Sequence, residues 1–535
     1  MTASRISDEP RMQAALTAPF VQEILDEKGF TEKKGYSGRV ITNLGREKLE
    51  KGLIYDQVDF IYSKFEEMIY LTDFNYITQK GNVVVNTSTI YNKESINILK
   101  RIIESGLSVS PYVNINEDKS GGEIDVTTLC GTTIDGILLN EGISSQLQYG
   151  GLLKIEDYQP IRFQDLISYK KTSLTPLDAF SSPKRTSILD VVSTGEGIIP
   201  ANFRLIPGIG REKTIDILKK LDKIGIGGVI GVSDEGKDIL GIPVPDGMVG
   251  IAVVGGITPF CAIQEEGEEI DIKIAEEIND FNTLSPITSK ITNHLKPVEH
   301  DIQPKIPFLL SKSWNLIQQV NFDIEKRKGN IISNISYLKK EDLDSALEIM
   351  EKTYNDNPKY INPYYNIVSH PTDDDKVGIA TICSLSIDGL LINNGIMSNP
   401  KYGGLLELTE PPLFIELISY NGSTVDPHKI FLSKNMTSIT LPNTPNKILA
   451  SFKEIPYIAR EYAVDLLDTL NKIGFSIYKI GKPREVTYNA KAENFNFGIV
   501  AGSGLNTIAA VREKGIDVEI KAIEKLMPFE KMDRL

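Results

Sequence analysis

The chain has 535 residues, of which 41% are hydrophobic and 24% are charged, and its formal net charge is −14. This composition is typical of a globular protein of several domains and excludes extensive disorder. The negative net charge excludes nucleic-acid binding over the whole surface, because most of that surface would repel phosphate.

The sequence carries no sign of export or membrane insertion. Its longest uncharged apolar stretch, residues 247–263, is shorter than a bilayer span and is interrupted by glycine and proline. The first residues lack the apolar core of a signal peptide. The three cysteines form no CxxC pair and the four histidines form no HxH or HExxH motif. We therefore expect a cytoplasmic protein with no membrane contact and no metal site.

The first predicted elements form a small basic unit within residues 1–55. Residues 18–28 have helical periodicity, residues 30–42 have the pattern of a β-hairpin, and a short helix follows to Lys51. The stretch 28–51 holds seven basic and three acidic residues, so it is positive within a negative chain. This order of helix, basic hairpin and helix is that of the back half of a winged helix.

In a winged helix, the hairpin contacts DNA phosphates while the preceding helix reads base edges. The DNA-binding candidates are therefore the basic residues of this unit, Lys28, Lys33, Lys34 and Arg39. The alternative is a solvated charged hairpin on a connecting helix. The motif alone does not decide between the two.

The rest of the chain is a tandem duplication. The segments TLC and IDGILLN at 128–140 return as TIC and IDGLLIN at 381–393, and YGGLL at 149–153 returns unchanged at 402–406. Matching segments continue on both sides at nearly the same offset, which indicates a duplicated domain rather than an array of short repeats. We predict one copy at residues 56–284, a proline-containing linker at 285–311 and a second copy at 312–535.

Each copy alternates β-branched runs with amphipathic helices. In the first copy, strands are expected at 83–85 and 124–126, and helices at 93–105 and 214–221. The apolar stripe from Val58 to Ile69 fits either a core helix or a dimer seam. The helices are too few for a doubly wound sheet, so the predicted fold class is α+β with mostly antiparallel strands. Our specific expectation is a ferredoxin-like sandwich in each copy.

With the hairpin and the duplication in place, the sequence resembles the NrpR family, nitrogen-regulation repressors of methanogenic archaea. The resemblance covers nearly the whole chain from Ile24 onward. It is carried by ILDEKGFTEKKGYSGRVIT at 24–42, TLC at 128–130, LLNEGI at 138–143, PANFR at 200–204 and VVGGITP at 253–259. It implies a homodimeric or homo-oligomeric repressor of nitrogen-fixation and ammonia-assimilation genes, which 2-oxoglutarate releases from operator DNA.

The sequence departs from the NrpR pattern at its front. Only about twenty residues precede the helix that would read bases, where the family has two further helices. That helix also lacks the Arg, Tyr and His residues expected to meet DNA. The alternative function is therefore a metabolite-sensing co-regulator that acts through a DNA-binding paralogue.

The effector implied by the resemblance is a compact dianion, which needs cationic groups and N–H donors in a mostly preformed pocket. The first copy offers PANFR and GGIT where the second has SFKE and SGLN. We therefore expect the first copy to sense 2-oxoglutarate, with no other cofactor. The candidate effector-binding residues are Thr128, Cys130, Asn202, Arg204, Gly255, Gly256 and Thr258.

Structural roles that involve no effector also fit the candidate effector residues. Arg204 fits an exposed arginine beside a loop, Gly255 and Gly256 fit a tight bend, and Cys130 fits a small core thiol. No nucleophile motif, phosphate-binding loop or metal motif points to catalysis, and no catalytic residue is assigned. Asp135 and Asp388 are interpreted as turn residues.

Overall fold

The computed structural model describes residues 54–117, 123–170, 172–182, 185–298, 306–441, 445–493 and 495–535, with short stretches nearer the N-terminus. Those stretches include β1 (Thr31–Lys33) and β2 (Arg39–Ile41), which pair antiparallel with Lys33 opposite Arg39. The predicted hairpin is therefore confirmed. Lys28 and Lys34 lie outside the described residues.

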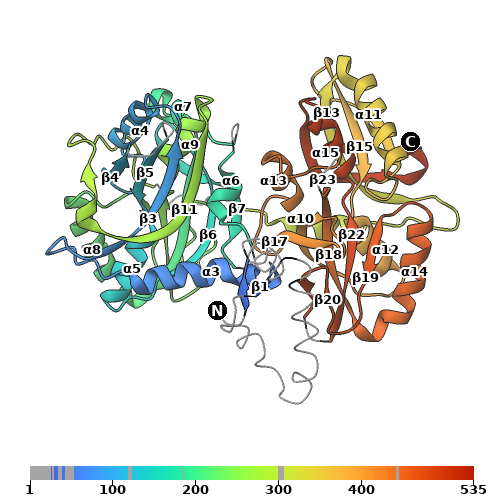
Figure 1. Ribbon diagram of the computed structural model, residues 1–535, viewed down its shortest axis with the longest axis horizontal. Helices are drawn as coiled ribbons and strands as arrows, with labels where there is room; N and C mark the ends of the chain where they lie inside the picture. Colours follow the sequence, from blue (N-terminus) through green and yellow to red (C-terminus); the bar gives the residue numbers. More distant parts are fainter. Residues whose placement is uncertain are drawn as a thin grey trace.

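A long helix, α3 (Ile54–Leu71), leads from the N-terminal unit into the first copy. Phe65 and Ile69 of α3 are buried in the core of that copy, which favours the core interpretation of the apolar stripe. The helix packs on α5 and also contacts β17 of the second copy. It therefore touches both halves of the protein, as Figure 1 shows.

The first copy contains two five-stranded antiparallel sheets, ordered β7-β6-β8-β10-β9 and β11-β3-β5-β4-β12. The elements are β3 (Asn82–Ile90), α4 (Ser95–Glu104), β4 (Tyr112–Asn116), β5 (Ile124–Leu129), α5 (Thr132–Asn140), β6 (Gln146–Glu156), β7 (Gln159–Ser168), α6 (Pro176–Phe180), α7 (Ile188–Thr194), β8 (Gly197–Pro207), α8 (Arg211–Lys223), β9 (Val229–Val232), β10 (Met248–Val254), α9 (Thr258–Glu265), β11 (Ile270–Asp280) and β12 (Ser285–Pro286).

The second copy repeats this arrangement, with sheets β17-β16-β18-β22-β19 and β23-β13-β15-β14-β24. Its elements are α10 (Leu309–Ile317), β13 (Asn330–Lys339), α11 (Leu343–Asp356), β14 (Tyr364–Ser369), β15 (Lys376–Ile382), α12 (Leu385–Asn393), β16 (Asn399–Glu407), β17 (Leu413–Ser419), α13 (Pro427–Ser433), β18 (Lys447–Pro456), α14 (Arg460–Lys472), β19 (Ile477–Ile480), β20 (Val486–Thr487), β21 (Ala490–Lys491), β22 (Asn496–Gly502), α15 (Asn506–Glu513), β23 (Glu519–Pro528) and β24 (Asp533–Arg534). The predicted α+β class and duplication are confirmed, with two five-stranded sheets in each copy where one sandwich was expected, and a further two-stranded sheet, β20-β21, in the second copy.

Each copy is built from two similar units that exchange their last strand. In the first copy, one unit runs β3-α4-β4-β5 and the other β8-α8-β9-β10. The strand that follows each unit pairs with the other one, because β6 lies beside β8 and β11 lies beside β3. Both sheets thereby have the strand order of a ferredoxin-like unit, and main-chain hydrogen bonds tie the two units together.

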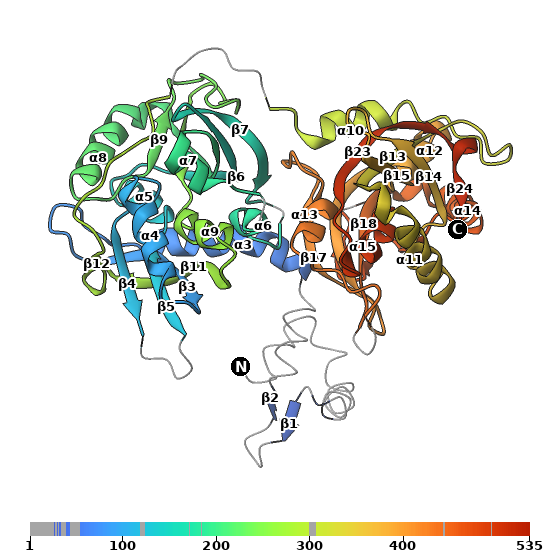
Figure 2. The same ribbon diagram turned by 90° about the horizontal axis from the view of Figure 1, so that it is seen from above.

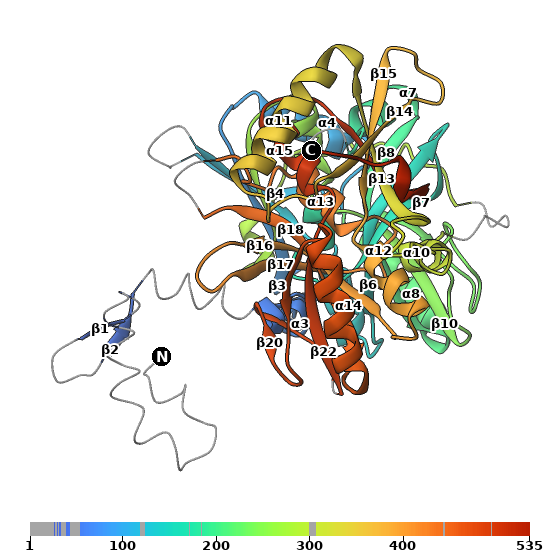
Figure 3. The same cartoon turned by 90° about the vertical axis from the view of Figure 1, so that its right-hand side faces the viewer.

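Helices cover the two sheets from opposite sides. Val84 packs in the cluster that contains α4 and α9, whereas its neighbours Val83 and Val85 pack in the cluster that contains α5 and α8. This alternation is the period of two expected of a strand buried on both faces. Figure 1 shows α4 and α9 above and α5 and α8 below, and Figure 3 shows α11 and α14 in the corresponding places of the second copy.

The two copies meet through reciprocal contacts. Ser173 N donates to Leu417 O at 2.9 Å and Leu417 N donates to Ser173 Oγ at 2.7 Å. The equivalent residues repeat the pattern in reverse: Thr424 N donates to Leu166 O at 2.9 Å and Leu166 N donates to Thr424 Oγ1 at 2.7 Å. A reciprocal pattern of this kind is that of a two-fold interface. Helices α6 and α13 touch at its centre (Figure 2).

Glu416 lies in this interface and accepts a hydrogen bond from Ser173 Oγ at 2.6 Å. Burial raises the pKa of its carboxyl to about 7, and the nearby Asp178 carboxylate acts in the same direction. The group therefore titrates near neutral pH in the folded protein.

We expect Glu416→Gln to stabilise the protein at pH 8 and much less at pH 5. A carboxyl with a folded-state pKa of about 7 and an unfolded-state pKa of about 4.3 binds its proton more tightly when folded, so the free energy of unfolding falls as the pH rises between these values. The neutral amide avoids this loss of free energy of unfolding. We expect a gain of only about 2 kcal/mol, since the side chain keeps some solvent contact and solvent screens its charge. Urea unfolding at both pH values measures it. An equal gain at both would show that the carboxylate is not the cause.

The predicted linker, residues 285–311, includes residues that belong to the two copies. Its first residues form β12 on the edge of a sheet, and Ile287, Leu295 and Val298 pack against the core of the first copy. Its last residues open α10, which begins at Leu309. The described residues 287–298 contain no helix or strand, and they are held by contacts with the first copy. In the described part of the chain, no helix is long and apolar enough to cross a membrane.

Candidate functional site

The centre of the first copy holds a buried ion pair. Arg204 projects from β8, which runs between β6 and β10, and its side chain is fully buried. Its Nη1 donates to Asp135 Oδ2 at 3.0 Å and to Gly131 O at 3.1 Å. Asp135 lies on α5 and also accepts a hydrogen bond from Ser145 Oγ at 2.5 Å. Arg204 is therefore not an exposed arginine, and its charge is balanced by a fully buried carboxylate.

Three nitrogen donors near this pair are buried without a partner: Arg204 Nε, Arg204 Nη2 and Asn86 Nδ2. They lie around two glycines. A Cβ at Gly131 would stand 3.7 Å from Arg204 Nη2, and one at Gly256 would stand 2.5 Å from Asn86 Nδ2. An unpaired buried donor costs about 1–3 kcal/mol, and more when it is charged. The site is therefore chemically suited to a group that supplies hydrogen-bond acceptors.

The other candidate residues lie in the same region, but most of their polar groups are already paired. Asn202 Oδ1 accepts from Tyr169 Oη at 2.6 Å. Thr128 Oγ1 donates to Gly256 O at 3.3 Å, and Thr258 Oγ1 donates to Gly255 O at 2.7 Å. The N–H of Gly255 donates to Pro200 O at 2.8 Å, so it is not free to hold an anion. These residues shape the site, whereas Arg204 supplies its unpaired charged donors.

Cys130 has the environment of a core thiol. It is buried, and its Sγ lies 3.4 Å from Thr132 Oγ1. Burial raises the pKa of the thiol, so it stays neutral and unreactive at neutral pH. Gly256 is required by close approach, because a side chain there would also stand 3.0 Å from the carbonyl of Leu129.

Interpreting Asp135 and Asp388 as turn residues is wrong. Asp135 lies within α5 and Asp388 within α12, and both side chains are fully buried. Each is paired with a cation of the long central strand, Arg204 in the first copy and Lys453 in the second. The sequence does hold a signal for this. Both copies place an aspartate in an apolar helix and a cation in an otherwise apolar strand, and a buried charge is stable only when it is paired.

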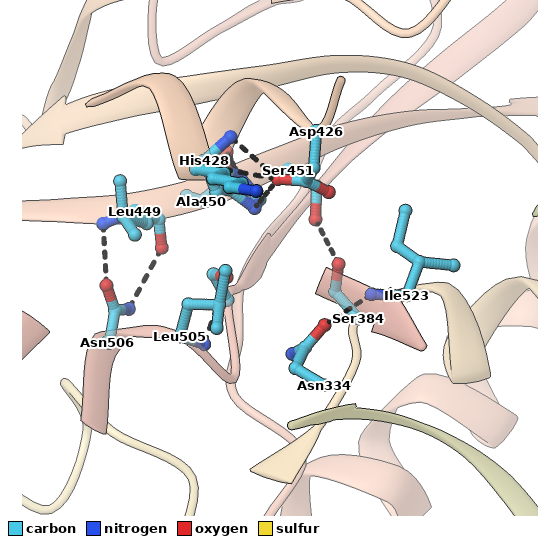
Figure 4. A network of polar contacts seen from close by, with 12 residues as sticks. Asn334, Ser384, Asp426, His428, Leu449, Ala450, Ser451, Leu505, Asn506 and Ile523 are labelled. Carbon is cyan, nitrogen blue, oxygen red and sulfur yellow. Dashed lines mark hydrogen bonds and ion pairs between the residues drawn. The ribbon is translucent and has the colours of Figure 1, made fainter. Parts of the chain in front are cut away.

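The second copy has a different centre, part of which Figure 4 shows. Lys453 Nζ lies 2.5 Å from Asp388 Oδ2, and Asp388 Oδ1 accepts from Ser398 Oγ at 2.7 Å. Ser451, the counterpart of Asn202, donates to Ser384 Oγ at 2.8 Å. The polar groups at this centre are therefore hydrogen-bonded to one another, whereas the first copy leaves donors of Arg204 and Asn86 without a partner.

Asn506 and His428 complete the second network. Asn506 bonds both the N–H and the carbonyl of Leu449, at 2.7 and 2.9 Å. His428 Nε2 lies 3.1 Å from Ala450 O, and burial lowers the pKa of the imidazole, which keeps it neutral. In the described part of this copy, the buried side-chain nitrogen and oxygen atoms without a partner are all hydroxyls, on Ser336, Thr381, Thr487 and Thr507. Each copy therefore has its own buried ion pair. Among the described residues, unpaired buried nitrogen donors lie in the first copy and not in the second.

A cavity of about 300 Å³ lies beside Ser145, the residue that donates a hydrogen bond to Asp135. It is lined by Tyr62, Phe65 and Ile69 of α3 on one side and by residues 144–147 on the other. Ser145 belongs both to this wall and to the hydrogen bond with Asp135. Lys170 also lines the cavity, and its Nζ lies 5.0 Å from the centre of the Tyr62 ring. The cavity thus connects α3 to the buried pair through one serine.

Family models and relatives of known function point to the same family. The model described as NrpR regulatory domains NRD1 and 2 matches residues 58–286 and 306–534, and a ribonuclease R winged-helix model matches residues 22–49. The chain is 34% identical over 514 residues to the global nitrogen regulator NrpR of Methanococcus maripaludis, covering 95% of this chain and 90% of that protein. It is 32% identical over 510 residues to NrpR of Methanocaldococcus jannaschii, covering 95% and 89%.

Two further relatives each match less than half of this chain. The global nitrogen regulator NrpRI of Methanosarcina mazei is 42% identical over 274 residues, which are 49% of this chain and 84% of that protein. A solved structure of the nitrogen repressor-like protein MJ0159 from Methanococcus jannaschii is 31% identical and covers 43% of this chain and 99% of its own, with a TM-score of 0.39. The tandem matches over both copies and the full-length relatives show that this chain belongs to the family of proteins with NrpR regulatory domains.

Proposed function

We propose that the protein is a transcriptional repressor of nitrogen-assimilation and nitrogen-fixation genes, acting in the cytoplasm as a regulator and not as an enzyme. It binds operator DNA through the N-terminal winged-helix segment, and 2-oxoglutarate bound in the first copy releases it. The observation that carries the effector proposal is the set of unpaired buried donors on Arg204 and Asn86. The full-length relatives are named global nitrogen regulators, which supports the choice of target genes.

The chemistry of 2-oxoglutarate complements these donors. Its two carboxylates and its keto group carry acceptors only, whereas the unpaired buried nitrogens of Arg204 and Asn86 are donors only. A guanidinium offers Nε and Nη2 side by side, which suits bidentate binding of a carboxylate. Burial already raises the pKa of Asp135. A second carboxylate beside Arg204 would raise it further, so binding is expected to be coupled to proton uptake.

Helix α3 provides a physical link between the effector site and DNA. It lines the cavity beside Ser145, contacts β17 of the second copy and leads to the winged-helix segment. A ligand alters DNA affinity only if it binds the two states of the protein differently. We propose that 2-oxoglutarate shifts the position of α3, and that two chains in a homodimer present their winged-helix segments to the two halves of an operator.

Arg204→Lys tests the effector site. Lysine keeps the charge opposite Asp135, as Lys453 does in the second copy, but it supplies no equivalent of Arg204 Nε and Nη2. We expect the variant to fold and to bind 2-oxoglutarate at least about 100-fold more weakly, since each of the two lost hydrogen bonds to a charged group contributes about 1.5–3 kcal/mol. Calorimetry measures the affinity, and a DNA-binding assay measures loss of release.

Lys453→Arg is the matched control in the second copy, and it should leave the affinity for 2-oxoglutarate unchanged. If Arg204→Lys binds the effector as tightly as the parent, the site lies elsewhere. If neither protein binds 2-oxoglutarate, the effector is wrong for this chain. If the parent binds 2-oxoglutarate but no operator DNA, the co-regulator function replaces the repressor function.

A further inference from the structure

The second copy carries a group of exposed apolar side chains where α14 begins. Tyr457 and Ile458 lie on the single helical turn before α14, and Tyr462 lies in the first turn of the helix. Phe495 lies beside them, because Tyr457 N donates to Phe495 O at 2.8 Å. The exposed fractions of Tyr457, Ile458, Tyr462 and Phe495 are 55%, 92%, 76% and 86%. We call these four residues the α14 patch. Helix α14 lies on the side of the second copy that faces away from the first (Figure 1 and Figure 3).

The first copy has the same backbone at this place but different side chains. Gly208, Lys213 and Gly247 stand where the second copy has its three aromatic residues, and Gly208 N donates to Gly247 O at the same 2.8 Å. The isoleucine is present in both copies, and Ile209 is 98% exposed although residues 287–298 also pack on the first copy. The place is therefore open to solvent in both copies, and it is aromatic in the second alone.

Phe495 is in a strained backbone conformation. Its φ is +66°, in the left-handed region that a bulky residue rarely adopts. The equivalent residue of the first copy, Gly247, has a φ of +76° without this strain. The Phe495 side chain is exposed, so packing within the chain does not offset the strain. A strained residue of this kind points to a role in function rather than in the fold of its own copy.

We infer that the α14 patch is the contact through which two chains form a dimer. Its three aromatic side chains, each of roughly 150–250 Å² and more than half exposed, give with Ile458 on the order of 500 Å² of apolar surface. Two such patches face to face bury about 1,000 Å², the area that a specific interface needs. The inference rests on the homodimer of the proposed function and adds the face that forms it.

The confinement of the patch to one copy makes an identical chain the partner. The two-fold contact of Ser173 with Leu417 is already formed within each chain, so a dimer of chains needs a different face. With one patch in each chain, contact between two patches closes after two chains. A patch on both copies would link chains into open arrays. Lys213 and the two glycines of the first copy exclude that outcome.

The test gives the second copy the residues of the first, as Tyr457→Gly, Tyr462→Lys and Phe495→Gly in the full chain. The first copy shows that this backbone accepts them. We expect the parent to sediment as a dimer at micromolar concentration, and the triple variant to associate at least about 100-fold more weakly, because buried aromatic residues carry most of the free energy of an interface. Sedimentation velocity over a range of protein concentrations measures both.

Phe495→Gly alone separates a lost contact from a lost fold. It should weaken the dimer about 10-fold, since one anchor of each patch is removed. The melting temperature of the dissociated chain should not fall, because glycine adopts the backbone conformation of this position without strain. A weaker dimer together with a lower melting temperature of the dissociated chain would mean that Phe495 supports the fold, which would overturn its role in the patch.

The matched control is the triple variant Ile77→Gly, Tyr91→Gly and Met397→Lys, which removes three exposed apolar side chains outside the patch and should keep the parental dimer. A parental dimer that the patch variant keeps would reject this face and leave the homodimer standing. A parent that sediments as a monomer would reject both. Equal loss of the dimer in the control would assign association to general surface hydrophobicity, against the proposal.

Discussion

Arg204→Ala is expected to lower the free energy of unfolding by about 3–5 kcal/mol, because it leaves the buried Asp135 carboxylate without its cation. Both side chains are fully buried, so water cannot replace the lost partner without opening the core. Desolvation already raises the pKa of Asp135, and removing Arg204 would raise it further. The loss of stability should therefore shrink as the pH falls and Asp135 becomes protonated. Urea unfolding at pH 8 and pH 5 measures both effects.

The double variant Arg204→Met with Asp135→Leu separates the ion pair from its packing. Apolar residues of similar volume often replace a buried pair at little cost, so this variant should recover most of the stability lost in Arg204→Ala. The double variant should still lack binding of 2-oxoglutarate, which would distinguish loss of the site from loss of the fold. If Arg204→Ala lowered the free energy of unfolding by less than about 1 kcal/mol, the centre of the copy would be hydrated and not closed to water.

The joint replacement of Lys33, Lys34 and Arg39 by alanine is expected to weaken DNA binding about 100-fold near 0.15 M salt. Each phosphate contact contributes about 0.9 to the slope of log affinity against log salt, so three lost contacts should lower that slope by about 2.7. The loss should be similar for operator and unrelated DNA, because phosphate contacts position the protein without reading sequence. Gel-shift titrations over a range of salt concentrations give both numbers.

A second triple variant controls for the loss of charge alone. Lys213, Lys219 and Lys220 are exposed on α8, and their replacement by alanine removes the same charge from the first copy. This variant should keep the parental slope. If both triple variants lose the same affinity, the hairpin makes no specific contact and the basic unit is only a solvated connector. A parental slope in the hairpin variant would equally reject the winged-helix contact.

The large features of the fold could be predicted because they repeat or alternate locally. The return of the IDGILLN segment as IDGLLIN and of YGGLL unchanged indicated the duplication. Gly35 and Gly38 between FTEKK and RVIT indicated the hairpin that β1 and β2 form. The exchange of β6 and β11 between units could not be predicted in this way. Register along one strand says nothing about which distant strand lies beside it, because pairing of that kind depends on packing of the whole copy.

Two segments that the sequence assigned to one candidate site are neighbours in the structure, and two buried polar residues beside them were not predicted. PANFR and GGIT do lie together, since β8 pairs with β10 and Gly255 N bonds Pro200 O. Asp135 was missed because an aspartate before glycine is common in turns, and only its tertiary partner Arg204 makes it tolerable inside a helix. Asn86 was missed because its amide resembles any polar residue of a strand until its unpaired nitrogen is seen against Gly256.

The reciprocal contact between the copies has a consequence for assembly. A single-copy chain that made the contacts of Ser173 and Leu417 would have to find a partner by diffusion, and dilution would separate the pair. Joining both halves in one chain turns that encounter into an intramolecular one, with an effective concentration on the order of millimolar for a short connection. The arrangement is therefore retained at any cellular abundance of the protein. It also guarantees that an arginine-centred half always stands opposite a lysine-centred half, a pairing that free subunits of two kinds would reach only in part.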